Sequence, residues 1–256
     1  MMGNMAEHSR LKSLAEDHTP WAVRRRLSSA PSPSYLHDFI YGAIDGTVTT
    51  FAVVAGVAGA DLGASVVIIL GGANLLADGF SMAVSNFLGS RAEYQRRERD
   101  RREEERHIRL FPHGEREEIR QIFAAKGFEG EDLERVTEVV TSNPEVWADT
   151  MMVEELGYGK AEPSALLAAG ATLLAFLTVG FLPLAAFVYD LIAPGTVDGA
   201  FTWSAVLTGV AFFVVGSSKS RYVEQFWLRA GLETLAVGGL AAVLAYAAGA
   251  LLKGVA

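Results

Sequence analysis

Cysteine is absent from the chain, and lysine and arginine are absent from residues 27–90. Without thiols the protein has no disulfide framework, thiolate zinc site, cysteine-ligated iron–sulfur cluster or cysteine nucleophile. A bound metal must therefore use oxygen, nitrogen or thioether ligands. Positive charge is also scarce, because 22 basic residues face 30 acidic ones and leave a formal charge of −8. This balance argues against nucleic acid as a partner, since phosphate binding needs a basic surface.

Apolar and charged residues are segregated along the 256 residues. Residues 91–162 hold 32 of the 52 charged side chains, although hydrophobic residues make up 50% of the whole chain. About 20 apolar helical residues span a bilayer, and five stretches are long enough: 35–60, 64–88, 164–192, 201–218 and 230–252. The sequence therefore predicts an all-α, polytopic membrane protein with five transmembrane helices and a helical cytoplasmic insert.

The basic residues predict the orientation of these spans. Five precede the first span, thirteen lie between the second and third, and three lie between the fourth and fifth, whereas the turns at 59–63 and 193–199 have none. Because cytoplasmic flanks retain lysine and arginine, the amino terminus and the insert are expected in the cytoplasm. The predicted parts are a flexible tail without a cleaved signal peptide (1–34), two spans (35–90), the insert (91–162) and three spans (163–256).

Helix formers and helix breakers divide the insert. No proline or glycine follows Gly89 until Pro112, so the second span should continue into the cytoplasm as one long helix to about residue 111. Apolar residues at helical spacing predict a second helix over 115–126, and a third helical stretch covers 132–156 with a break or a new start at Pro144. An insert of this size is marginal as an independent fold.

Ionisable residues inside the spans are the first candidates for function, because burying them in a bilayer is costly. Asp38 and Asp45 share one face of the first span, and Asn74, Asp78 and Met82 share one face of the second. No lysine or arginine within a span can pair with Asp45. Each residue also has a plainer explanation: headgroup water for Asp38, a bond to a neighbouring helix for Asp78, and ordinary packing for Met82.

Carboxylate oxygen combined with thioether sulfur suits a borderline divalent ion such as Fe²⁺ better than Mg²⁺ or Ca²⁺. The segments 38–56 and 77–82, the sequence around Pro112, and the segment 147–157 resemble the vacuolar iron transporter family. This resemblance implies a five-span homodimer without a permanently bound cofactor. It would exchange cytosolic Fe²⁺, and in some cases Mn²⁺, Zn²⁺ or Co²⁺, for protons through a pathway at the dimer interface.

The resemblance also assigns residues. It places Asp45 and Met82 in the pathway, and it makes the insert a metal-binding domain through Glu104, Glu115, Glu118, Met151, Met152 and Glu155. Spacing is compatible with this assignment, because members of each group lie three or four residues apart on one helix face.

Three positions depart from the family pattern. His107 stands where members typically have a glutamate, so imidazole becomes a ligand whose protonation would oppose capture. Asn74 and Ser34 stand where some members have acids, which leaves fewer proton acceptors for exchange.

The working hypothesis is a transporter rather than an enzyme. The insert captures Fe²⁺ and delivers it near Asp38, and the ion crosses at paired Asp45 and Met82. Two alternatives stay open, a membrane-anchored iron-oxidising or storage protein, suggested by the Glu104-x-x-His107 spacing, and a metal-sensing scaffold without flux. The expected location is the plasma (inner) membrane of a prokaryote or the vacuolar membrane of a eukaryote. No nucleotide-binding motif accompanies the spans, so ion gradients are the expected energy source.

Overall fold

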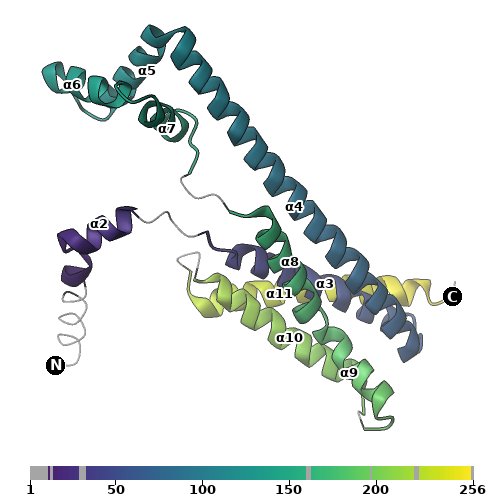
Figure 1. Ribbon diagram of the computed structural model, residues 1–256. Coiled ribbons are helices and arrows are strands. Elements are labelled where there is room, and N and C mark those ends of the chain that lie inside the picture. The colour runs from purple at the N-terminus through teal and green to yellow at the C-terminus, as the bar shows by residue number, and fades with distance from the viewer. Residues whose placement is uncertain are drawn as a thin grey trace. The chain divides into compact units, whose positions relative to one another are not determined.

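The computed structural model describes residue 11 and residues 14–28, 33–159, 163–196, 198–221 and 225–254, and every regular element in these ranges is a helix. The all-helical prediction is confirmed. Two compact units form, one from Ser34–Glu93 with Pro163–Ala256 and the other from Met1–Pro33 with Tyr94–Glu162. The helices (Figure 1) are α2 (Pro20–Ser28), α3 (Leu36–Gly59), α4 (Ala64–Leu110), α5 (Pro112–Ala125), α6 (Gly130–Thr141), α7 (Pro144–Glu154), α8 (Ala165–Gly180), α9 (Leu182–Ile192), α10 (Ala200–Lys219) and α11 (Trp227–Leu252).

Among the described residues, four helices are long and apolar enough to cross a membrane, namely α3, α4, α10 and α11. The predicted third span is not one continuous helix, because α8 and α9 meet at an angle of 51°. The cause is Pro183, which lies in the first turn of α9 and has no N–H to continue the hydrogen bonding of α8. With this bent pair counted as one span, the chain has the five crossings that the sequence predicts.

One ion pair supports counting the bent pair as a crossing. Lys253 follows α11, and its Nζ lies 2.8 Å from Oδ2 of Asp61 in the turn between α3 and α4. The two residues therefore lie on the same side of the membrane, which requires an even number of crossings between them. Helices α4, α10 and α11 supply three, so α8 and α9 together must supply the fourth.

Helix α3 lies at the centre of the membrane unit and packs on α8, α10 and α11. Glycine permits the closest crossings, because a Cβ at Gly42 would overlap the backbone of Thr172 and one at Gly46 would overlap Phe176. An apolar cluster fills the other end of the bundle, from Phe51, Val54, Val57, Val67, Leu184 and Phe187. The face of α3 that carries Gly42 and Gly46 is thereby held in close contact with α8.

The long helix predicted for the second span is confirmed by α4, which has 47 residues. In the insert, α5, α6 and α7 gather beside the end of α4 (Figure 1) around an apolar core of Ile108, Ile119, Val140, Trp147, Ala148 and Met151. The expected break at Pro144 separates α6 from α7, and the side chain of Asn143 caps α7 by accepting from the backbone N–H of Glu145 at 2.9 Å.

Within the segment predicted to be a flexible tail, Pro20–Ser28 forms a helix with no buried residue. Thr19 accepts a hydrogen bond from the N–H of Ala22, and Pro20 occupies the first turn, so this helix has a regular beginning. Residues 1–10, 12–13 and 29–32 of the predicted tail lie outside the described residues.

Candidate metal sites in the insert and the membrane

Three side chains of the insert converge as a candidate metal site. Glu104 and His107 lie three residues apart on α4, and Glu115 projects from the first turn of α5. One donor atom from each lies within 4.8 Å of the other two, and Nδ1 of His107 is 3.5 Å from Oε1 of Glu115. Two ligands on one ion, each about 2.1 Å from it, lie at most about 4.2 Å apart. Small side-chain rotations would therefore complete the coordination.

Burial and mutual repulsion make this cluster unfavourable without a cation. Glu115 is only 6% exposed, and its Oε2 has no hydrogen-bond partner among the described residues. Burial, followed by the charges of Glu118 and Glu104, raises the pKa of Glu115 to about 7. Burial also raises the pKa of Glu104 and of Glu155, and repulsion between neighbouring carboxylates adds to both shifts. A divalent cation would offset both the burial of these carboxylates and the repulsion between them.

The remaining candidate ligands of the insert have different surroundings. Glu118 and Glu155 are exposed but close enough to raise the pKa of Glu115. Met151 is fully buried in the apolar core beside Ile119, and Met152 is 3% exposed. The structure thus brings the glutamates and His107 into one electrostatic group, while Met151 has the packing role that a core methionine ordinarily has.

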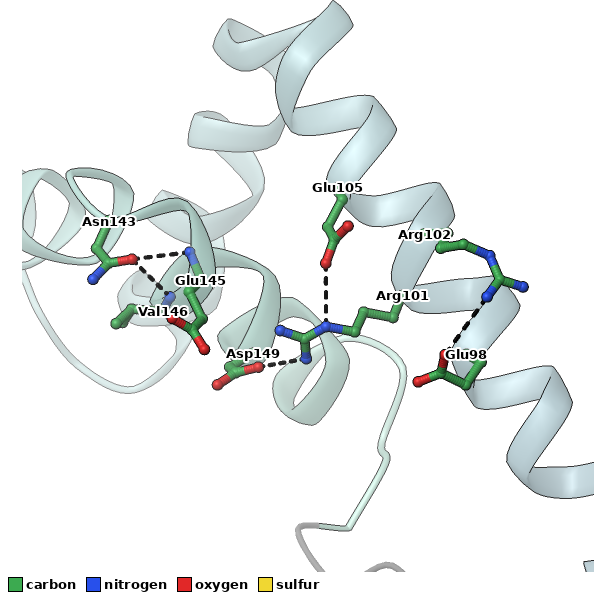
Figure 2. A network of polar contacts seen from close by, with 8 residues as sticks. All are labelled: Glu98, Arg101, Arg102, Glu105, Asn143, Glu145, Val146 and Asp149. Carbon is green, nitrogen blue, oxygen red and sulfur yellow. Dashed lines mark hydrogen bonds and ion pairs between the residues drawn. The ribbon is translucent and has the colours of Figure 1, made fainter.

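Two contacts attach α7 and its carboxyl end to α4. Figure 2 shows Arg101 reaching from α4 to Asp149 on α7, with 2.6 Å between Nη1 and Oδ1, while its Nε donates to Glu105. Beyond α7, the hydroxyl of Tyr158 donates to Oδ2 of Asp100 at 2.6 Å. These residues escaped the sequence analysis, because their partners lie 48 and 58 positions apart.

The membrane unit contains a cavity of about 420 Å³ at the polar face of α3 and α4. The predicted pathway residues Asp38, Asp45, Asp78 and Met82 all line it. Asn74 does not, although its amide nitrogen is buried and has no partner among the described residues. Sequence analysis missed the other lining residues, which are His37, Tyr41, Ser81, Ser85, Asn86 and Thr172.

The lining has the charge of a cation site. Three carboxylates and the Met82 thioether face the cavity, and no lysine or arginine is among its lining residues. Oxygen and sulfur donors together suit a borderline divalent ion. Because helical periodicity places Asp38 with Asp45, and Asp78 with Met82, on single faces of α3 and α4, the two helices present their donors to one space.

Comparison with known proteins identifies the family of this chain. The model of the VIT family matches residues 36–250. This chain belongs to the VIT family. It is 34% identical over 228 residues to the vacuolar iron transporter of Toxoplasma gondii, covering 87% of this chain and 76% of that protein. It is 31% identical over 212 residues to vacuolar iron transporter 1 of Arabidopsis thaliana, covering 82% and 83%.

Another VIT family relative, the vacuolar iron transporter of Plasmodium berghei, aligns over 256 residues at 28% identity and covers 98% of this chain and 88% of its own length. These relatives are named as transporters and not as enzymes. The matched region includes both the membrane cavity and the insert cluster, so the similarity is not confined to the apolar spans.

If the cluster of this VIT family insert is a metal site, the raised pKa of Glu115 predicts that its metal affinity depends on pH. A proton and a cation compete for the same carboxylate, so the Mn²⁺ affinity should fall roughly tenfold per pH unit as the pH drops below about 7. Mn²⁺ electron paramagnetic resonance on the purified protein between about pH 5 and pH 8 measures this. A pH-independent affinity over that range would contradict the assignment of Glu115 as a ligand.

Tyr158 should support the same site from outside it. Replacing it with phenylalanine removes the hydrogen bond to Asp100 and frees the segment that carries Glu155, so the Mn²⁺ affinity should fall by a few fold, equivalent to about 1 kcal/mol. The exposed Tyr94, on the same helix as Asp100, provides the control variant Tyr94→Phe with unchanged binding. Equal Mn²⁺ affinities for Tyr158→Phe and the wild type would show that Tyr158 does not support the site.

Proposed function

We propose that this VIT family protein moves Fe²⁺ out of the cytosol, and Mn²⁺ as a second substrate, in exchange for protons. The observation that carries the proposal is the cavity, where Asp38, Asp45, Asp78 and Met82 meet with no lysine or arginine among the lining residues. Buried carboxylates in a bilayer need a counter-charge, and a mobile cation supplies it. The iron transporters among the relatives support iron as the cation.

The insert supplies the capture step in this proposal. Its cluster is Glu104, His107 and Glu115. The pKa of Glu115 lies at about 7, so this carboxyl gives up its proton as the ion binds, and capture itself releases protons to the cytosol. The ion then enters the membrane cavity near Asp38 and is held deeper by Asp45 and Met82. As the ion leaves these carboxylates, protons from the opposite side replace it, which gives an exchange driven by the proton gradient.

The proposal includes a homodimer in which α3 and α4 of two copies enclose the pathway. Its support is the open side of the cavity, where the lining residues Tyr41, Ser81 and Ser85 are exposed. A second copy of this chain packed there would place two sets of Asp45 and Met82 across one axis. Cross-linking of a cysteine placed at Ser85, in a chain that has no cysteine of its own, tests this arrangement.

Flux in sealed proteoliposomes tests the function. With an acidic lumen, external Fe²⁺ kept reduced should enter faster than without a gradient, Mn²⁺ should follow, and a protonophore should remove the acceleration. A rate of metal entry that does not depend on the pH gradient would refute proton exchange but not transport. Oxygen consumption on Fe²⁺ addition without any flux would instead favour the iron-oxidising alternative.

A further inference from the structure

We propose that Asn86 is a positioning residue that presents the carboxylate of Asp38 to the entering cation, an inference that rests on the proposed transport function. The side-chain Nδ2 of Asn86 on α4 donates to Oδ1 of Asp38 on α3 at 2.9 Å and to Oγ1 of Thr172 on α8 at 2.7 Å. All three residues line the membrane cavity. One amide therefore joins three helices at the wall of the candidate pathway.

The hydrogen-bonding groups around the Asn86 amide determine which way it faces. A carboxylate only accepts hydrogen bonds, so the NH₂ group of Asn86 must face Asp38, and its Oδ1 accepts from Ser90 at 3.2 Å. Both amide hydrogens are then used, one on Asp38 and one on Thr172. The Thr172 hydroxyl in turn donates to the carbonyl of Ala168 at 3.1 Å. The amide of Asn86 and the hydroxyl of Thr172 are thus fully hydrogen-bonded, which rigidifies the network.

The network leaves Asp38 with one oxygen for a cation. Oδ1 is occupied by Asn86, whereas Oδ2 makes no hydrogen bond or ion pair to any described residue. Asp38 is thereby fixed in direction and offers a single oxygen to the cavity. Without Asn86, the carboxylate would rotate freely, and part of the cation's binding energy would be lost in ordering it.

Asn86 also sets the position of the α4 donors. Asp78, Met82 and Asn86 recur at four-residue spacing along one face of α4. Thr172 belongs to the rigid pair of α3 and α8, where Gly42 allows backbone contact. The hydrogen bond from Asn86 to Thr172 therefore fixes the position of α4 relative to α3 and α8. It thereby keeps Asp78 and Met82 opposite Asp38 and Asp45.

A binding experiment tests the role without requiring flux. In the full-length protein carrying Glu104→Gln and Glu115→Gln, which weaken the insert site, the remaining Mn²⁺ binding is measured by electron paramagnetic resonance. Adding Asn86→Ala should weaken that binding about tenfold, as loss of a residue that orients a ligand does. Thr172→Val should weaken it less, since Asn86 keeps its contact with Asp38. Thr178→Val on α8, whose hydroxyl bonds only within its own helix, is the matched control.

A double-mutant cycle separates positioning from general damage to the fold. In the same background carrying Asp38→Ala, the Asn86→Ala change should weaken Mn²⁺ binding much less, because only its contact with Thr172 is then left to lose. An equal loss in both backgrounds, an unchanged affinity, or the absence of any binding that depends on Asp38 would overturn the proposal.

Flux is the second readout. In proteoliposomes Asn86→Ala should raise the KM for Fe²⁺ about tenfold and change the maximal rate far less, whereas an unchanged KM would overturn the proposal. If the wild type shows no flux while the binding cycle behaves as expected, the proposed function fails and the role of Asn86 stands.

Discussion

Replacing Asp45 with alanine is expected to abolish metal flux, with a loss of at least about 100-fold, while leaving Mn²⁺ binding by the insert intact. Asp45 lies on the cavity face of α3, with no lysine or arginine among the cavity's lining residues. Its carboxylate is therefore available to a passing cation as its counter-charge. Removing it leaves the ion without that ligand inside the bilayer, and a barrier higher by about 3 kcal/mol slows passage by that factor.

The measurement is Fe²⁺ uptake into proteoliposomes, with Mn²⁺ binding measured on the same preparation. Asp198→Ala is the control, because this exposed carboxylate lies in the turn before α10 and outside the cavity. Undiminished uptake by Asp45→Ala would contradict the transport role, and simultaneous loss of binding by the insert would indicate a folding defect instead.

The second large effect is expected for Glu115→Gln, and it has two opposite parts. Glutamine keeps the shape of the side chain but cannot supply a charged ligand, so the Mn²⁺ affinity of the insert should fall about 10- to 100-fold. The metal-free protein should become more stable near pH 8. The reason is that the wild type must hold a buried, repelled carboxylate ionised there, whereas glutamine is neutral.

The sign follows from proton binding. Because the folded pKa of Glu115 lies near 7, above its usual value of 4.5, the native state binds more protons than the unfolded state between these values. The stability of the metal-free wild type should therefore fall as the pH rises from about 4.5 to 7, by at most about 3 kcal/mol. In Glu115→Gln this fall should be much smaller, with Glu104 and Glu155 contributing the remainder.

Thermal unfolding with and without Mn²⁺ measures both parts. Glu117→Gln is a close control, since Glu117 lies on the same helix but is exposed and pairs with Arg120. A variant that loses stability and affinity together would show that Glu115 holds the fold of the insert rather than a metal.

Helical spacing was sufficient to predict much of the membrane site. Asp38 and Asp45 on one helix, and Asp78 and Met82 on the next, line the cavity as residues on a shared face should. The same spacing placed Asn74 with them, yet Asn74 is not a lining residue. Periodicity gives the direction of a side chain around a helix but not where along the helix a cavity ends. That end depends on packing, since Gly71 meets Leu184 and Gly79 meets Phe176 between α4 and the bent third span.

In the insert, too, part of the site follows from local sequence and part depends on tertiary packing. The pairing of Glu104 with His107 follows from their positions on one helix, and the restart at Pro112 predicts a second helix carrying Glu115. Their convergence within 4.8 Å depends on the angle between α4 and α5, which the core around Ile119 and Trp147 determines. The attachments by Arg101 and Tyr158 join residues 48 and 58 positions apart, and no local pattern indicates such pairs.

By itself, the sequence determined that this chain crosses a membrane with a charged helical insert on the side of its basic residues. It could do so because transfer into lipid and the placement of positive charge act on each segment separately. Only the tertiary structure decided which polar groups meet. The bend at Pro183, the raised pKa of Glu115 and the amide of Asn86 between Asp38 and Thr172 all depend on distances between helices, and those distances are set by packing across the whole unit.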